Sequence, residues 1–138
     1  MLCKTSGLQM QFKYKLDQDK KKATVKMSGI QDIDEYIAFY KELMTDIEGK
    51  GITSILWDAR KLDVRKVTTG HIEKGIMFMN HWSSIRKGGK SACVVKDVFS
   101  YGIGRMFQNM AEAKNLFERN IKIEIFKDYK EAEKWICE

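Results

Sequence analysis

Apolar and polar residues alternate in two segments near the N-terminal end of the chain. Residues 10–16 and 23–27 each place an apolar side chain at every second position. A period of two is typical of a strand that buries one face. The lysine-rich run Lys20–Lys22 lies between these segments and follows Asp17 and Asp19. This pattern predicts two paired strands joined by a solvated hairpin tip.

The spacing then changes to that of a helix. Apolar residues recur every three or four positions over residues 33–47. Asp32 is placed to cap this helix, with Glu35 as its reciprocal capping partner. Gly49 follows the last apolar position and marks the end of the helix.

Strand-like and helix-like segments alternate along the rest of the chain. Strands are expected at residues 52–57, 90–96 and 121–125. Helices are expected at residues 69–82, 99–111 and 128–136. The second of these helices extends to Leu116 and Phe117, and the third begins with a capping pair of Asp128 and Glu131.

This order of elements predicts an α/β domain. Strands separated by helices need crossover connections, so we expect a mostly parallel five-stranded sheet with four helices and an antiparallel first strand. Residues 10–138 form this single domain, and residues 1–9 precede it as an N-terminal extension.

Composition agrees with one folded domain. The chain has 138 residues, of which 43% are hydrophobic and 32% are charged. The net charge of +6 is unevenly distributed: residues 1–30 carry seven Lys and two Asp, whereas residues 31–50 carry six acidic residues and two Lys. Exposed aromatic residues are not interleaved with the basic run, so we expect no nucleic-acid partner.

The three cysteines, Cys3, Cys93 and Cys137, are widely spaced and odd in number. This spacing fits neither a disulfide framework nor a metal site of the Cys-x-x-Cys type.

The N-terminal residues show no signal-peptide pattern, and the longest run of large apolar residues is Ile76–Met79. We therefore expect a cytoplasmic protein with no transmembrane segment.

Three short stretches, in order, resemble the SpoIIAA-like family of the STAS and Sec14-like group. They are Trp57–Arg60 at the end of a strand, Phe99–Met106 at the start of a helix, and Phe126–Asp128 followed by Glu131–Ala132 and Trp135–Ile136. The likeness covers about residues 10–137 and implies a STAS-like fold.

The resemblance also implies a function without catalysis. STAS domains such as the bacterial anti-anti-sigma factors bind partner proteins and are switched by phosphorylation of a hydroxyl at the start of a helix. The equivalent hydroxyls here are those of Thr68 and Thr69, although Val67 replaces the usual aspartate and both serines are threonines. Either threonine also suits a helix cap. Other relatives are associated with lipids or small apolar ligands.

The helix around Gly75–Ile85 is apolar on nearly all sides. Ile72, Ile76, Met79 and Trp82 (or Ser83) can line the core face, which leaves Met77, Phe78 and Ile85 for other faces. The helix is then either fully buried or presents a partner surface. We expect Met77, Phe78, Trp82 and Ile85 to contribute to a homodimer interface, a partner-protein surface or an apolar pocket.

Three carboxylates, Asp58, Asp97 and Asp128, follow predicted strands, where α/β proteins bind ligands. Asp58, Arg60 and Arg105 are candidate contacts for an anion or ligand. Asp97 and Asp128 also suit helix caps, and no phosphate-loop or DxD motif accompanies them. We therefore expect no catalytic residues, no metal and no cofactor. His71 and His81 are about 15 Å apart along one helix, too far to share a metal.

Three hypotheses follow from the sequence. The first is a regulatory binding module that engages a protein partner or itself, with a switch at Thr68 or Thr69. The second is a carrier or sensor of a lipid or small apolar ligand. The third is a weak phosphate-processing enzyme that uses Asp58 and Asp97.

Overall fold

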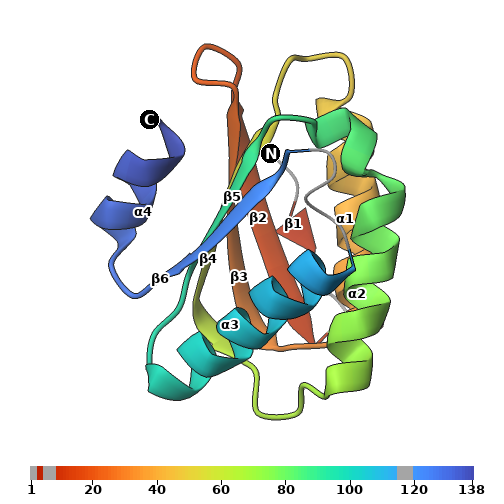
Figure 1. Cartoon of the computed structure of the whole chain (residues 1–138), viewed down its shortest axis with the longest axis vertical. Coiled ribbons are helices and arrows are strands. Elements are labelled where there is room, and N and C mark those ends of the chain that lie inside the picture. The colour runs from red at the N-terminus through yellow and green to blue at the C-terminus, as the bar shows by residue number, and fades with distance from the viewer. Residues whose placement is uncertain (1–2, 5–8, 115–119) are drawn as a thin grey trace.

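The chain folds into one twisted sheet with helices on both faces, as a computed structural model shows (Figure 1). The structure describes residues 3–4, 9–114 and 120–138. The strands are β1 (Cys3–Lys4), β2 (Met10–Asp17), β3 (Lys22–Ile30), β4 (Ser54–Asp63), β5 (Lys90–Val94) and β6 (Lys122–Phe126). The helices are α1 (Ile33–Ile47), α2 (Thr69–His81), the short 3-10 helix η1 (Ser83–Arg86), α3 (Val98–Ala113) and α4 (Tyr129–Ile136).

The strands lie in the sheet in the same order as in the chain. β1–β2 and β2–β3 are antiparallel pairs, whereas β3–β4, β4–β5 and β5–β6 are parallel. The expected five strands, four α-helices and antiparallel first strand of the α/β domain are confirmed. The structure adds β1 at the edge, because Cys3–Lys4 of the expected N-terminal extension pairs with residues 12–13 of β2.

The helices divide unequally between the two faces of the sheet. α1, α2 and α3 cover one face, and α4 alone lies against the other (Figure 1). The α1 side of the core is densely packed: the rings of Phe12 and Phe39 stack at 4.1 Å, and Trp57 lies beside them. α4 packs on the opposite face over Leu56, Ala92 and Val94, through Ala132 and Ile136.

Three aspartates begin helices, as their positions in the sequence predict. The carboxylates of Asp32, Asp97 and Asp128 accept hydrogen bonds from the backbone N–H groups of Glu35, Ser100 and Glu131, respectively. α3 therefore begins at Val98. Its expected extension to Leu116 and Phe117 lies outside the described residues.

The expected reciprocal role of Glu35 in the first cap is wrong. Its carboxylate accepts hydrogen bonds from the backbone N–H groups of Met10, at 2.8 Å, and Gln9, at 3.2 Å. These N–H groups lie at the start of β2, so Glu35 joins α1 to that strand. The sequence pattern did not reveal this contact because the partners lie about 25 residues away.

A buried arginine connects η1 to two strands. Arg86 is 1% exposed and donates hydrogen bonds from Nε to the Thr53 carbonyl and from Nη2 to the Lys90 carbonyl and Ser91 Oγ, at 2.7–3.1 Å. Within the described residues it forms no ion pair, so neutral acceptors satisfy the buried charge. These contacts fix the end of the α2 segment to the starts of β4 and β5.

Gly29 allows the start of β2 to approach β3 closely. Its φ is +91°, and a Cβ atom there would lie 2.1 Å from the Gln9 carbonyl oxygen.

We expect Gly29→Ala to lower the free energy of unfolding by about 3 kcal/mol or more, because the strain of the backbone conformation and the clash with the backbone of Gln9 add together. Urea denaturation measures this change. Gly88→Ala is the matched control, since Gly88 has φ +80° but no atom within 4 Å, and it should cost only about 1 kcal/mol. Equal losses in the two variants would contradict the role of the close approach.

Candidate functional site

An apolar cavity of about 160 Å³ lies between the sheet and helices α1, α2 and α3. Its floor comes from the side chains of β4, β5 and β6 that face these helices. Its walls come from helical residues and from the loops at the carboxyl ends of the strands. The lining is mostly apolar and includes Ile33, Tyr36, Trp57, Leu62, Val64, Val67, Ile72, Met79, Cys93, Val95, Ile103, Phe107, Ile123 and Ile125.

The cavity exists because α3 is only loosely packed on the sheet. Among its 16 residues, only Ser100 and Ala111 are fully buried, whereas Ile103 and Phe107 line the cavity and remain half-buried. One point of α3 approaches β6 closely: a Cβ atom at Gly104 would lie 2.9 Å from Ile125 Cγ2. This contact sets the position of the helix and leaves space beside it.

Two polar groups of the cavity lining, Cys93 and Tyr36, are uncharged at neutral pH. Burial raises the pKa of the Cys93 thiol to about 12, and the nearby negative charge of Asp58 adds to this effect. Burial also raises the pKa of Tyr36 well above its usual value. The Tyr36 hydroxyl donates to Met79 Sδ at 3.7 Å, a weak hydrogen bond that a ligand oxygen or nitrogen could replace.

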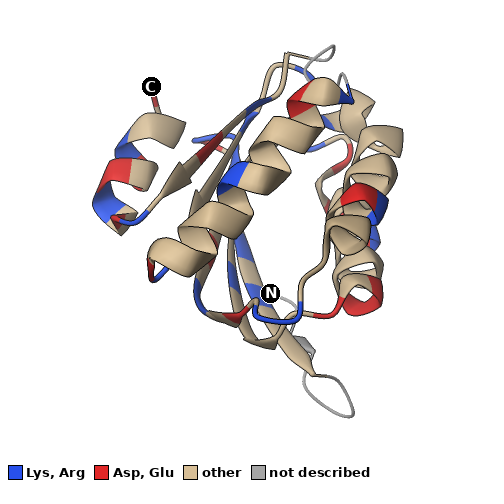
Figure 2. Cartoon of the chain, turned by 60° about the horizontal axis from the view of Figure 1, so that its bottom comes forward, with Lys and Arg blue, Asp and Glu red and all other residues tan. Residues whose placement is uncertain are grey.

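The cavity reaches the surface at the carboxyl edge of the parallel strands. Val64 and Val67 of the β4–α2 loop line it and are half-exposed, and the lining residue His71 is exposed. Ser100 lines it from the start of α3. This edge is where open α/β sheets bind their ligands. Figure 2 brings the edge forward, with the loop and the start of α3 in view.

The two candidate phospho-acceptors lie beside this mouth. Thr68 caps α2: its Oγ1 accepts from the backbone N–H of His71 at 3.1 Å, and the backbone N–H of Thr68 donates to His71 Nδ1 at 3.2 Å. Thr69 is the first residue of the helix, and both threonines are exposed. The cap that the sequence suggested is present, and it lies next to cavity-lining Val67.

The four apolar residues of the expected partner surface are separated by the fold. Met77 is 63% exposed, whereas Phe78, Trp82 and Ile85 are half-buried and pack against the α1 side of the core. The ring of Phe78 contacts Tyr40, with centroids 6.2 Å apart. These four residues therefore do not form one exposed apolar surface, and the cavity lies on the inner side of α2.

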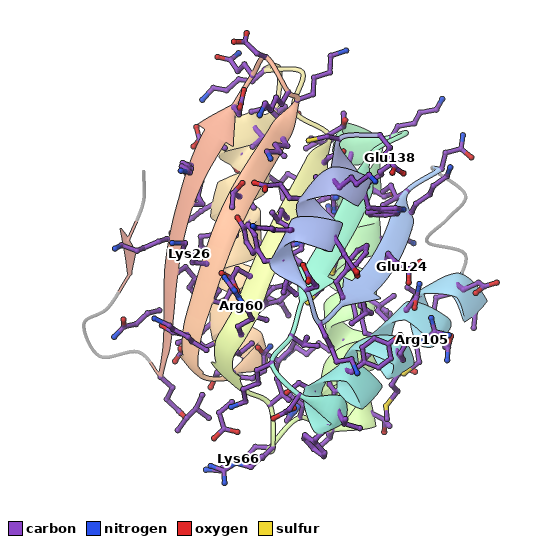
Figure 3. The ribbon with its side chains drawn as sticks, turned by 90° about the vertical axis from the view of Figure 1, so that its left-hand side faces the viewer. Lys26, Arg60, Lys66, Arg105, Glu124 and Glu138 are labelled. Atoms are coloured by element: carbon purple, nitrogen blue, oxygen red, sulfur yellow. The ribbon has the colours of Figure 1, made fainter. Side chains whose placement is uncertain are left out.

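The candidate anion contacts occupy two separate places. Asp58 is buried within β4 and accepts hydrogen bonds from Arg60 Nε and Nη2, both at 2.8 Å, which lowers its pKa. The Arg60 guanidinium also lies 4.8 Å from the centre of the Tyr129 ring. Arg105 lies on α3 and donates to Gln108 Oε1 at 2.7 Å. Figure 3 shows Arg60 and Arg105 on these different elements.

The three aspartates of the expected carboxyl edge all have partners. Asp58 binds Arg60, and Asp97 and Asp128 cap helices. In the part of the chain that the structure describes, no three His, Cys, Asp or Glu residues are placed together to hold a metal ion. Nor is any described helix long and apolar enough to cross a membrane.

Sequence reasoning missed the cavity itself. Cys93 lies in the strand expected at residues 90–96, but it is only half-buried, and the pattern could not show that it faces empty space. A weak signal was present in α3, where Gly104 provides no side chain on the face of the helix toward β6.

Comparison with known proteins identifies the fold. A crystal structure of an uncharacterized protein of the DUF3478 family from Shewanella loihica PV-4, described as having a SpoIIAA-like fold, aligns with 97% of this chain and 99% of its own. The TM-score is 0.58 and the sequence identity is 17%. No family model matches the chain, and no curated protein matches its sequence. The structural match shows that the chain has a SpoIIAA-like fold.

The raised pKa of Cys93 makes a direct prediction about thiol reactivity. Only the thiolate attacks iodoacetamide, and a pKa of about 12 leaves roughly one thiolate in 10⁴ at pH 8. In a Cys3→Ser background, we expect Cys93 to be alkylated at least about 100-fold more slowly than Cys137, which is exposed. Peptide mass spectrometry over time measures both rates. Similar rates for the two thiols in the folded protein would contradict the burial of Cys93.

Proposed function

We propose that this SpoIIAA-like domain is a non-catalytic binding module that holds a small apolar ligand. The observation that carries the proposal is the cavity of about 160 Å³ at the carboxyl edge of the sheet. The SpoIIAA-like fold supports a module of the STAS type in general. The cavity favours ligand binding among the functions that the sequence left open.

The size of the cavity restricts the ligand. An engineered apolar cavity of about 150 Å³ in another protein binds benzene. A cavity of similar volume here suits a single ring or a short alkyl chain, or one end of a longer chain that leaves through the mouth. Complete enclosure of a lipid with two acyl chains would require a larger cavity.

The chemistry of the lining favours an uncharged ligand. A charge would lose its hydration without gaining an opposite charge, since Cys93 on the floor and Tyr36 on the wall are neutral. One acceptor atom on the ligand could accept a hydrogen bond from the Tyr36 hydroxyl, whose present acceptor is only the thioether sulfur of Met79. We therefore expect an apolar molecule with at most one or two polar atoms.

An empty cavity of this size is costly. The apolar side chains that line it have no packing partner on the side that faces the space. A ligand that fills the cavity recovers part of this energy and binds only the folded state, so it should raise Tm.

The central prediction is that filling the cavity blocks ligand binding. Benzene, indole and 1-octanol serve as small apolar probes, and at saturation at least one of them should raise Tm of the wild-type protein in calorimetry. Cys93→Phe adds a ring at the cavity floor and should weaken binding of that probe at least tenfold, because the side chain occupies the same space. Cys137→Phe is the matched control, since Cys137 is exposed and does not line the cavity.

A second variant guards against misfolding of the first. Val67→Phe places the added volume at the mouth instead of the floor, and it should also reduce probe binding while circular dichroism stays unchanged. The proposal is wrong if no probe raises Tm, or if both filled variants bind the probe as the wild type does.

A second candidate function is the regulatory module, supported by the exposed threonines at the start of α2. A phosphate on Thr69 would lie at the positive end of the helix, where the helix dipole stabilises it. Because Thr68 and Thr69 lie next to cavity-lining Val67 and His71, such a phosphate would also change the cavity mouth. A protein partner or a second copy of the chain would then respond to the modified surface.

This second candidate predicts a modified form of the native protein. Phosphopeptide mass spectrometry of protein from its natural source should find phosphate on Thr69 or Thr68, with Thr69 favoured because its hydroxyl is not used in the cap. Thr45 is a matched internal control, since it is also exposed but its hydroxyl donates to the Lys41 carbonyl within α1. Complete coverage of the Thr68–Thr69 peptide with no modified fraction would count against the switch.

A further inference from the structure

A polar hollow of about 610 Å³ lies on the α4 side of the sheet, between the β2–β3 hairpin and α4. This volume is within the range of pockets that take small molecules. Figure 3 faces this side of the sheet and shows β2 and β3 beside α4. The apolar cavity lies on the other face, so the two spaces are separate. Most residues that line the hollow are charged or can form hydrogen bonds: Lys15, Leu16, Asp17, Gln18, Asp19, Lys20, Lys22, Thr24, Tyr129 and Glu133.

One lysine of this hollow is buried. Lys22 is 7% exposed, so the expected solvated hairpin tip holds for Lys20 and Lys21, which are exposed, but not for Lys22. The Nζ of Lys22 points toward α4 and donates to Cys137 Sγ at 4.0 Å, its only hydrogen-bond partner among the described residues. A thiol sulfur is a weak acceptor. Because a buried charge is costly unless it is paired and hydrogen-bonded, Lys22 is suited to receive an anion.

Two further donors lie beside Lys22 on the same face of the sheet. Lys15 of β2 is directly opposite Thr24 of β3, and Thr24 is two residues from Lys22. Residues at every second position of a strand share a face, so these three side chains all lie on the α4 side. Tyr129 lines the hollow from α4. Two ammonium groups and a hydroxyl group can therefore contact one anion.

The carboxylates of the hollow do not neutralise its lysines. Asp17 is directly opposite Lys22 in the sheet, but its Oδ1 accepts a hydrogen bond from the backbone N–H of Lys20 at 3.1 Å. Asp19 and Glu133 are exposed. In the part of the chain that the structure describes, none of the three lysines of the hollow forms an ion pair. Their positive charge is therefore available to a ligand.

We propose that this hollow binds a small molecule through a phosphate group, which Lys22, Lys15 and the hydroxyl of Thr24 hold. A phosphate monoester carries a charge of about −1.5 to −2 at neutral pH, which two ammonium groups balance. A carboxylate, with a single charge, would leave one ammonium uncompensated. The phosphate oxygens can also accept a hydrogen bond from the hydroxyl of Tyr129. This site does not depend on the apolar cavity, so the domain would bind two ligands on opposite faces of its sheet.

Isothermal titration calorimetry with inorganic phosphate, at constant ionic strength, tests the proposal. The wild-type protein should bind phosphate, and Lys22→Met should weaken binding at least about tenfold because the buried ammonium is lost. Lys15→Gln should weaken binding about fivefold, since this lysine is exposed and its charge is partly screened. Glycerol 3-phosphate is titrated in the same way, and the tighter of the two ligands shows whether the site takes the free ion or an ester.

Lys21→Met is the matched control. Lys21 is the neighbouring exposed lysine and does not line the hollow, so its substitution removes the same charge and should leave phosphate binding unchanged. Without phosphate, Lys22→Met should have a Tm equal to or above that of the wild type, because an apolar side chain replaces a buried charge that has no counter-charge. Lys22→Met should also bind the apolar probe as the wild type does, which separates this site from the cavity.

Four results would overturn the proposal. The first is the absence of phosphate binding to the wild-type protein. The second is binding that Lys22→Met and Lys15→Gln both leave unchanged. The third is acetate binding as tight as that of phosphate, since the site would then take a carboxylate. The fourth is a Tm of Lys22→Met well below that of the wild type, which would show that the folded protein already compensates this ammonium.

Discussion

The architecture depends on the fact that the strands follow one another across the sheet in chain order. Each parallel crossover from β3 to β6 then turns in the same sense, and helices in such connections lie on one face of the sheet. α1, α2 and α3 are therefore confined to one side, and only α4, which follows the last strand, reaches the other. The cavity, its mouth and the exposed part of α3 all follow from this one-sided arrangement.

The three helices on this face of the sheet differ in how densely they pack against it. The α1 side is filled by stacked aromatic rings and by α1 residues that are almost completely buried. The α3 side holds a smaller cluster, and there most apolar side chains of the helix border the cavity or the surface. Dense packing on one side supports the fold and allows the other side to carry a space in which apolar side chains lack packing partners.

Local patterns in the sequence predicted most of the elements, because these patterns arise from contacts within a few residues. The capping aspartates Asp32, Asp97 and Asp128 were recognisable since each binds an N–H group three residues along the chain. The hairpin and the helix periods were recognisable for similar reasons. Features that join distant segments were not: Glu35 binds the start of β2, Arg86 binds β4 and β5, and β1 pairs with β2.

The sequence by itself determined an α/β domain with an antiparallel first strand, and the resemblance in three short stretches led to the SpoIIAA-like fold. It also placed Thr68 at the start of a helix. Only the tertiary structure decided which apolar residues fill the core and which border a space. Periodicity tells which side of a helix or strand faces inward, but it cannot tell how far apart two facing elements stand. That distance is set where Gly104 meets Ile125, so Cys93 of β5 and Tyr36 of α1 border a cavity, while Val98 and Phe99 lie at the surface.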